Sequence, residues 1–402
     1  MARLHWMTMV LGGAGILALG CVAAFAASSD ATVRAGDELR VRCEGNRITS
    51  TRIDQTNIVI KCPGSTATPT PTRTNTVASA ATRTNTPLAT ATGTNTPTRT
   101  PTSVPPTPTP TVIPSTGSAP NIGGCQVFPA DNPWNTDISS YAVHPNSAAY
   151  IAKIDSIASN NSQKYLHADF GGNGEYGIPY MVVPATQALA PITWTAYGNE
   201  SDPGPYPIPQ NAPVENGSDA HVLVVRQGEC KLYELYAASP NGTGWNAASG
   251  AIWNLSSNAL RTEGWTSADA AGLPVLAGLA RYDEVAAGAM RHALRFTVNR
   301  TLIGGYIHPA THWAGGDSDP NLPPMGLRLR LRADFNISGY TGQSRVILET
   351  LKMYGMIIAD NGSNDFITGA RDTRWNDVDL NQLKLIPTTA FEVVNTGPIT
   401  AP

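Results

Sequence analysis

The chain has 402 residues, of which 41% are hydrophobic and 14% are charged, and its formal net charge at pH 7 is −3. A slightly acidic chain lacks the basic surface of a nucleic-acid-binding protein, and it contains no GxSxG motif, phosphate-binding glycine loop or dinucleotide fingerprint. We therefore expect neither nucleic acid nor a nucleotide as partner. The 37 glycines and 32 prolines favour a loop-rich, β-rich fold over a helical bundle.

Residues 1–26 have the pattern of a secretory signal peptide. Arg3 supplies a positive charge, residues 10–19 form an apolar run, and residues 24–26 fit a small-x-small cleavage site. The run is too short for a comfortable membrane span, and no other apolar stretch approaches about 18 residues. We expect a secreted protein with no integral membrane span after cleavage. Lipoprotein anchoring through Cys21 is the alternative, because the residues before it resemble a loose lipobox.

The cysteines suggest disulfides. Removal of residues 1–26 would leave four of the 5 cysteines, and an even number in an exported chain is typical of disulfide bonding. No CxxC spacing occurs, so a zinc–cysteine site is not expected. Pairing each cysteine with its nearest neighbour predicts Cys43–Cys62 and Cys125–Cys230.

Two segments precede the main domain. Residues 31–64 alternate polar and apolar side chains, which predicts a small β module that depends on its disulfide. It is either a surface- or glycan-contacting module or a passive stapled hairpin. Residues 65–118 repeat Thr-Pro and Thr-Asn-Thr-Pro, which predicts a disordered, extended linker. Such linkers resemble those that tether the catalytic domains of secreted bacterial polysaccharide-degrading enzymes to an anchoring module.

Residues 120–396 form the main domain. Apolar residues at helical spacing predict helices over 146–158 and 344–362. Strands are predicted at 177–183, 191–197, 221–225, 231–238, 293–298 and 327–333. The last strand alternates leucine with arginine, which predicts one buried and one basic face. We expect an α+β fold dominated by β-structure, as an antiparallel sandwich or jelly-roll-like domain with a few helices.

Two histidine–carboxylate pairs stand at i, i+2 spacing. Asp169 follows His167, and His221 follows Asp219. On extended backbone such residues share a face, so each pair could bind a metal or orient a general-base histidine. The alternative is local bonding to the backbone at strand ends. A metal is therefore left open, and no other cofactor is expected.

The loop 198–219 carries several prolines together with Asp202, Tyr206 and Glu215. Long loops in a compact domain are often functional, and a rigid loop could present Tyr206 to a sugar ring, with carboxylates beside it. The alternative is a surface loop whose tyrosine packs inward.

The segment 266–285 is mostly small or aliphatic, with charges near both ends. Asp269 can be explained by a turn that begins with hydroxyl residues and that Gly272 closes. A functional interpretation places Trp265 and Asp269 at a cleft, which Asp283 or Glu284 could reach together with His292. We interpret the segment as core whose terminal charges could line a cleft.

Further along the chain, His308 and His312 are four residues apart, but Pro309 favours a loop over a helix, so a zinc protease is not expected. A single functional histidine, His312 beside Trp313, is the stronger candidate. Asp360 is expected at the end of the second helix, where a structural ion pair with Arg371 or Arg374 would offset the helix dipole.

The stretches FPADNPWNTDIS, DPGPYPIP, WTSADAAGLPVLAGLARYDEV, RHALRFTV, PPMGLRLRLRA and YGMIIADNGS occur between residues 128 and 363. Together they resemble a family of uncharacterised, secreted bacterial β-rich domains, over about residues 125–396. This resemblance implies no activity and no catalytic residues.

From these features we favour a secreted carbohydrate-active enzyme, a glycoside hydrolase that acts on a polysaccharide or cell-surface glycan with one carboxylic acid and one carboxylate. The candidate acid/base residues are Asp169, Asp202, Glu215, Asp269, Asp283, His221 and His292, and the candidate substrate-binding residues are Tyr206, Trp265, His312 and Trp313. A polysaccharide lyase would instead use histidine and tyrosine, with the basic arginine face neutralising a uronate. The same features also fit a non-catalytic glycan- or surface-binding protein, or an orphan structural surface protein. An enzyme requires two titratable groups in one pocket, whereas a binding protein requires only exposed aromatic side chains.

Overall fold

The computed structural model describes residues 119–315 and 317–401, together with four strands near the N-terminus. The chain divides into two compact units, Met1–Pro105 and Pro106–Pro402. In the first unit an antiparallel sheet has the strand order β2-β1-β3-β4. Its strands are β1 (His5–Val10), β2 (Ile16–Cys21), β3 (Glu38–Arg42) and β4 (Ile48–Arg52). The signal peptide and the small β module stay predictions. Cys43, Cys62 and the linker 65–118 lie outside the described residues.

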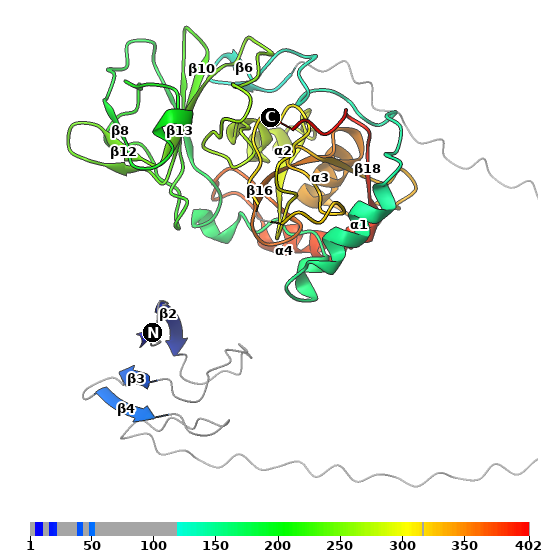
Figure 1. The fold of residues 1–402 in the computed structure, drawn as a ribbon, viewed down its shortest axis with the longest axis horizontal. Helices are drawn as coiled ribbons and strands as arrows, with labels where there is room; N and C mark the ends of the chain where they lie inside the picture. Colours follow the sequence, from blue (N-terminus) through cyan, green and yellow to red (C-terminus); the bar gives the residue numbers. More distant parts are fainter. Residues whose placement is uncertain are drawn as a thin grey trace, which may run out of the picture. The chain divides into compact units, whose positions relative to one another are not determined.

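The second unit contains four sheets and four α-helices among its described residues (Figure 1). The first sheet orders β13 (Ser249–Asn254), β10 (Lys231–Tyr236), β9 (Val222–Arg226) and β7 (Tyr180–Val183). The second orders β11 (Ser239–Pro240), β12 (Trp245–Ala247) and β8 (Ile192–Trp194). The third orders β17 (Phe366–Ile367), β14 (Leu294–Val298), β16 (Met356–Asn361), β15 (Arg328–Leu331) and β18 (Phe391–Val393). A short pair joins β5 (Asn121–Ile122) to β6 (Cys125–Gln126), and the helices are α1 (Ser147–Ser156), α2 (Tyr282–Ala286), α3 (Gly342–Met353) and α4 (Asp377–Leu380).

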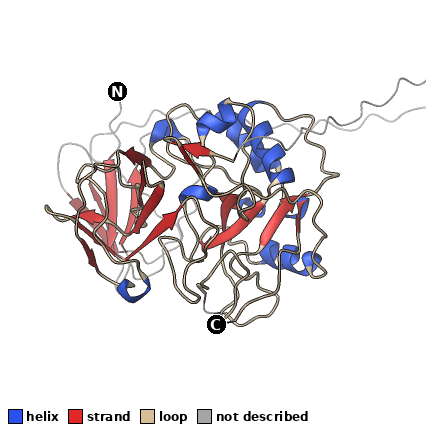
Figure 2. Cartoon of the chain, turned by 90° about the horizontal axis from the view of Figure 1, so that it is seen from above, coloured by secondary structure: helices blue, strands red, loops and turns tan. Residues whose placement is uncertain are grey.

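The elements of this unit are grouped by position. Strands β8, β10, β12 and β13 lie at one end, and α1, α3, α4 and β18 lie at the other (Figure 1). The view from above shows the same division, with strands crowded at one end and most helices at the other (Figure 2). The predicted β-rich α+β class is confirmed. The pairs β7–β9, β8–β12 and β14–β16 are parallel, so the sheets are mixed rather than antiparallel throughout, and a sandwich or jelly roll stays a prediction.

The prediction of a single helix over 344–362 is correct for its first half and wrong for its second half. Helix α3 ends at Met353, and β16 begins at Met356. Gly355 between them has φ +67°, and a Cβ there would lie 2.2 Å from the Leu329 carbonyl oxygen, so the chain turns at a position that only glycine fits well. The apolar residues beyond it form a buried strand, because a short apolar run does not by itself distinguish a strand from a helix.

The predicted basic face of 327–333 is also wrong. Arg328 and Arg330 on β15 are buried. The Arg328 guanidinium donates to the carbonyl oxygens of Pro133, Thr136 and Tyr354, and Arg330 donates to Ile138 and forms an ion pair with Glu392. The backbone over residues 133–139 therefore covers the face that the alternation predicts to be solvated.

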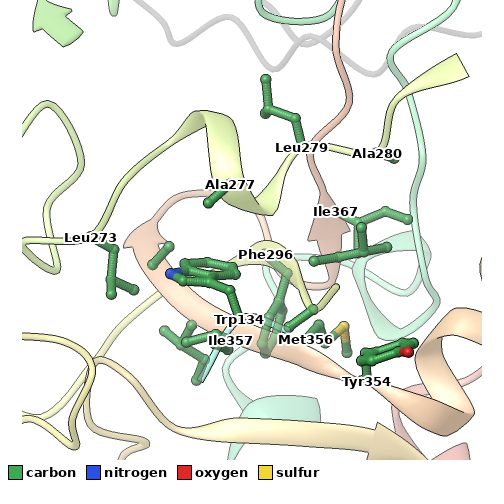
Figure 3. Close-up of a cluster of buried hydrophobic side chains, with 14 of the residues drawn as sticks. Trp134, Leu273, Ala277, Leu279, Ala280, Phe296, Tyr354, Met356, Ile357 and Ile367 are labelled. Carbon is green, nitrogen blue, oxygen red and sulfur yellow. The ribbon is translucent and has the colours of Figure 1, made fainter. Parts of the chain in front are cut away.

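The core is built around β14, β16 and the segment 273–280. Leu273, Ala277, Leu279 and Ala280 belong to the same buried cluster as Trp134, Phe296, Met356, Ile357 and Ile367, and Ala277 lies above the Trp134 ring (Figure 3). Burial of each large apolar side chain contributes roughly 1.5–3 kcal/mol. The interpretation of this segment as core is confirmed.

The Cys125–Cys230 disulfide is present, as predicted. It joins β6 to the turn between β9 and β10 across a sequence separation of 105 residues. In the chain-entropy account, closing a loop of this length stabilises the fold by roughly 4–5 kcal/mol. Among the described residues, no helix is long and apolar enough to cross a membrane.

Candidate functional site

Two adjoining hollows share Asp169 and Tyr176. One has a volume of about 430 Å³ and is also lined by Asp377 and Lys384. The other has a volume of about 240 Å³ and is also lined by Glu215, Asn216, Phe366 and Thr368. The Tyr176 side chain is 59% exposed. We call the two hollows together the Tyr176 groove.

Asp169 is held at this groove by two basic side chains. Its carboxylate lies 3.0 Å from His167 Nδ1 and 2.7 Å from Lys384 Nζ, so the pairing with His167 expected from the i, i+2 spacing is present. His167 Nε2 donates to the Ser162 carbonyl oxygen, and the imidazole stacks on Phe366. Burial opposes ionisation, but the hydrogen bonds from His167 and Lys384 hold the pKa of Asp169 below its ordinary value. Asp169 is therefore a carboxylate at neutral pH.

Glu215 and His221 form the second pair at the groove. His221 Nδ1 lies 2.5 Å from the Glu215 carboxylate, and Nε2 lies 2.9 Å from the Ala268 carbonyl oxygen. A carbonyl oxygen can only accept, so Nε2 carries a proton. Burial of both groups opposes their charges, but their mutual hydrogen bond raises the pKa of His221 and lowers the pKa of Glu215. The pair is an imidazolium beside a carboxylate.

The predicted pairing of His221 with Asp219 is wrong. Ala220 between them has φ +42°, in the left-handed region, so the backbone is not extended there. The i, i+2 residues therefore do not share a face, and His221 turns toward Glu215, six residues earlier in the chain. This loop geometry brings Glu215 to the groove.

Arg295 on β14 joins three parts of the chain. Its Nε and one terminal nitrogen form a bidentate pair with Asp269, at 2.8 and 2.7 Å. The other terminal nitrogen donates to Thr368 Oγ1 at 2.7 Å, and Thr368 lines the groove. The Asp360 carboxylate lies 3.8 Å from the guanidinium. Arg295 and Asp269 are both buried, so the bidentate pair is shielded from solvent.

A bulge positions Asp360. Strands β14 and β16 are parallel, and their register shifts between Phe296 and Thr297, so Thr297 pairs with Asp360 instead of Ala359. Side chains two residues apart on a strand share a face, so Asp360 lies on the same face as Arg295. The expected partners Arg371 and Arg374 are not those that Asp360 contacts.

The residues around Arg295 include more acidic side chains than basic ones. We call Glu215, His221, Asp269, Arg295 and Asp360 the Arg295 network; it has three carboxyl groups and two basic groups. The positive charge of Arg295 also lowers the pKa of Glu215, so Arg295 influences Glu215 as well as Asp269 and Asp360. Burial and the neighbouring Asp269 raise the pKa of Asp360 to about 7. The Asp360 side chain remains 29% exposed, so it can exchange a proton with a ligand or solvent.

Two predicted residues of the 198–219 loop lie outside the groove. Asp202 forms a 2.5 Å ion pair with Arg261 in a separate hollow of about 240 Å³ that Trp265 also lines. Tyr206 is fully buried, and its hydroxyl donates to the Asp202 carbonyl oxygen. The Tyr206 ring packs inward and is not available to a ligand, so the interpretation that this loop presents Tyr206 to a sugar is wrong.

Asp283 and His292 do not reach the cleft that the sequence suggests. Asp283 is exposed and pairs with Arg374. His292 is fully buried, with Nδ1 2.8 Å from the Ala293 carbonyl oxygen and Nε2 3.1 Å from Glu284. Glu284 also accepts from Arg281 at 2.9 Å. Arg281, Glu284 and His292, which we call the His292 network, form a closed structural cluster.

The two histidines of the 308–312 loop have different partners. His308 Nε2 lies 2.8 Å from Glu263, whereas His312 Nδ1 donates to the Ala270 carbonyl oxygen at 2.7 Å. The His312 ring stacks beside Trp313, 5.5 Å between centroids. Within residues 119–315 and 317–401, no group of three or more histidine, cysteine, aspartate or glutamate side chains is arranged to hold a metal ion.

Sequence reasoning missed Arg295, Tyr176 and Thr368, and it gave Asp360 a purely structural role. One signal was present, because Arg295 is a charged residue in a strand in which Leu294, Phe296 and Val298 are apolar, and buried charges require partners. Its partners could not be read from the chain, since Asp269 and Thr368 lie 26 and 73 residues away.

Comparisons with protein-family models, with curated proteins and with solved structures found no match for this chain. The resemblance to secreted bacterial domains therefore stays an expectation, and the function is argued from the site itself.

Proposed function

We propose that the main domain, residues 120–396, is a glycoside hydrolase that acts on a polysaccharide by carboxylate acid/base chemistry. The observation that carries the proposal is the Arg295 network, in which Asp269 and Asp360 contact one buried guanidinium and Glu215, whose pKa the same charge lowers, lines the groove. Hydrolysis of a glycosidic bond requires one protonated carboxyl group and one carboxylate, and such a surplus of acid supplies both.

The surroundings of each carboxyl group assign its role. Glu215 is kept ionised by His221, and Asp269 is engaged by the bidentate bond to Arg295. Asp360, with a pKa of about 7, is the member of the network that holds a proton near neutral pH. We assign Asp360 as the proton donor to the leaving oxygen and Glu215 as the carboxylate that faces the anomeric carbon. Asp269 and Arg295 are positioning residues.

The Tyr176 groove supports a polymeric substrate. Its two hollows adjoin at Asp169 and Tyr176, so a chain of sugars could occupy both. The exposed tyrosine offers an apolar ring to the C–H face of a sugar. Lys384, Asp377 and Asn216 supply polar groups for hydroxyls along the walls.

Secretion is part of the proposal. The Cys125–Cys230 disulfide supports an oxidising compartment, as does the signal-like sequence of residues 1–26. The Thr/Pro-rich segment 65–118 would then separate the enzyme from the N-terminal residues as a spacer.

A non-catalytic glycan-binding protein is the second candidate function. The exposed Tyr176 alone favours it, since binding needs no proton donor. A polysaccharide lyase loses its main support, because Arg328 and Arg330 are buried and offer no basic surface to a uronate.

The test uses the full-length protein and a panel of neutral and acidic polysaccharides. Formation of new reducing ends and ultraviolet absorbance from unsaturated products are measured together. We expect reducing ends without that absorbance, and a rate that falls as the pH rises through about 7, because Asp360 loses its proton.

Variants then separate chemistry from folding. Asp360→Asn and Glu215→Gln should each lower the rate by roughly 100-fold or more. Asp283→Asn, the matched change at an exposed carboxylate, should leave it unchanged. Unsaturated products would establish a lyase instead, and retention on a polysaccharide without any cleavage would establish a binding protein.

A further inference from the structure

A second cavity is separate from the proposed catalytic groove. It has a volume of about 410 Å³ and shares no lining residue with the Tyr176 groove. Its lining includes Tyr141, Asn258, Leu260, His308, Arg328 and Thr396. We call it the Arg328 pocket. Cavities of roughly 300–1,000 Å³ are typical of small-molecule sites.

The charge of Arg328 has no carboxylate partner within the described residues. Its side chain donates from Nε to the Tyr354 carbonyl oxygen, from one terminal nitrogen to Tyr354 and Thr136, and from the other to Pro133. These four bonds leave one of the five guanidinium N–H groups free. All of the acceptors are neutral carbonyl oxygens. The residue is 3% exposed.

Burial of this charge is costly. Burial lowers the pKa of Arg328 to about 9, although Tyr141 and Asp137 oppose that change through their charges. The guanidinium is still a cation at neutral pH, and a bound anion would relieve the cost of its burial.

Thr396 supplies a second polar group without a partner. Its Oγ1 is buried and has no hydrogen-bond partner within the described part of the chain. Buried hydroxyl groups are nearly always bonded, and Thr396 lines the cavity, so a turn of this side chain toward the cavity would let the hydroxyl bond to a ligand there. Tyr141 and Leu260, which are 37% and 42% exposed, add apolar surface to the same pocket.

We propose that the Arg328 pocket binds a small organic carboxylate of about the size of a sugar acid. The carboxylate accepts from the free N–H of Arg328 and from the Thr396 hydroxyl, and the body of the ligand packs on Tyr141 and Leu260. Asp131, an exposed carboxylate bonded to Asn258, also lines the pocket and disfavours ligands with more than one negative charge.

The test is calorimetric titration of the full-length protein with glucuronate, with glucose as the neutral match and inorganic phosphate as the competing oxyanion. We expect heat of binding and a raised melting temperature with glucuronate, neither with glucose, and weaker binding of phosphate. Equal binding of glucose and glucuronate, or binding of neither, would overturn the proposal. Phosphate binding as tightly as glucuronate would overturn the assignment to a carboxylate.

Variants locate the bound ligand. Thr396→Val keeps the shape of the side chain and should weaken glucuronate binding by roughly threefold to tenfold, through loss of one hydrogen bond. The matched change Thr186→Val, at an exposed threonine, should have no effect. Arg328→Met should abolish binding if the variant folds, and the threonine variants decide the question if it does not. Glucuronate binding that is weakened by Tyr176→Ala and not by Thr396→Val would place the ligand in the groove and overturn the proposal.

Discussion

The Arg295 network and the His292 network are built from the same parts. In each, one imidazole nitrogen faces a glutamate and the other faces a backbone carbonyl oxygen, and an arginine lies nearby. They differ in the ratio of acid to base. The His292 network sets one carboxylate against a guanidinium and an imidazole, whereas the Arg295 network sets three carboxyl groups against two basic groups.

The ratio of acidic to basic groups decides whether a network contains a carboxyl group that holds a proton near neutral pH. Although burial opposes the charge, Arg281 and His292 lower the pKa of Glu284 to about 2, so Glu284 stays ionised at neutral pH. In the Arg295 network the surplus acid leaves Asp360 with a pKa of about 7. A cluster in which basic groups outnumber the carboxylate keeps that carboxylate ionised and stabilises the fold, and a cluster with surplus carboxyl groups can also supply a proton.

The largest expected effect is that of Arg295→Met. The substitution leaves Asp269 buried without a counter-charge, so we expect a loss of about 3–5 kcal/mol of unfolding free energy, measured by urea denaturation. Arg281→Met should cost less, because Glu284 keeps His292. Arg332→Met, at an exposed pair with Asp334, is the control and should leave stability unchanged. Equal losses for Arg295→Met and Arg281→Met would break the comparison.

The next effect concerns acid stability. The shift of the Glu284 pKa from 4.5 to about 2 corresponds to about 3 kcal/mol. Because the folded-state pKa is the lower one, this stabilisation is present above about pH 4.5 and is lost as the pH falls toward about 2. Glu284→Gln should therefore be less stable than wild type at pH 7, and the difference should shrink between these pH values. A pH-independent difference would contradict the assignment.

Asp360→Asn should raise the stability of the protein, whereas Glu284→Gln should lower it. The folded-state pKa of Asp360 is the higher one, about 7 against 3.8, so wild type loses stability as the pH rises from about 4 to about 7. The asparagine variant avoids that loss. Allowing for partial exposure of the side chain, we expect it to be more stable by about 1–2 kcal/mol at pH 8, with no gain below about pH 4. Thermal unfolding at both pH values measures this, and a destabilised variant at pH 8 would show that Asp360 is an ordinary ion-pair partner.

The smallest expected effect is that of Tyr176→Ala. Its exposed ring contributes little to folding, so thermal stability should not change. Loss of a stacked ring corresponds to about 0.5–1.5 kcal/mol, or a threefold to tenfold weaker affinity for the polysaccharide that the wild type cleaves or retains. Tyr197→Ala, at another exposed tyrosine that does not line the groove, is the matched control. Equal weakening by both variants would argue against the groove as the binding site.

Part of this site was predictable from local pattern. His167 and Asp169 meet as their spacing predicts, and Asp169, Glu215, His221 and Asp269 were all among the candidates. The same spacing rule failed at Asp219 and His221, because one residue with positive φ reverses the face of the chain. The prediction for Tyr206 failed for another reason. Neither the prolines of its loop nor its polar neighbours indicate whether the ring points into the core or toward solvent.

The sequence by itself determined the β-rich class, the buried segment 273–280 and the Cys125–Cys230 pairing. Each of these depends on alternation, composition or order along the chain, which are local or countable properties. Only the tertiary structure decided that Arg295 meets Asp269, Thr368 and Asp360. Those contacts depend on the parallel register of β14 and β16 and on one bulge, and a shift of a single residue in a strand moves a side chain to the other face.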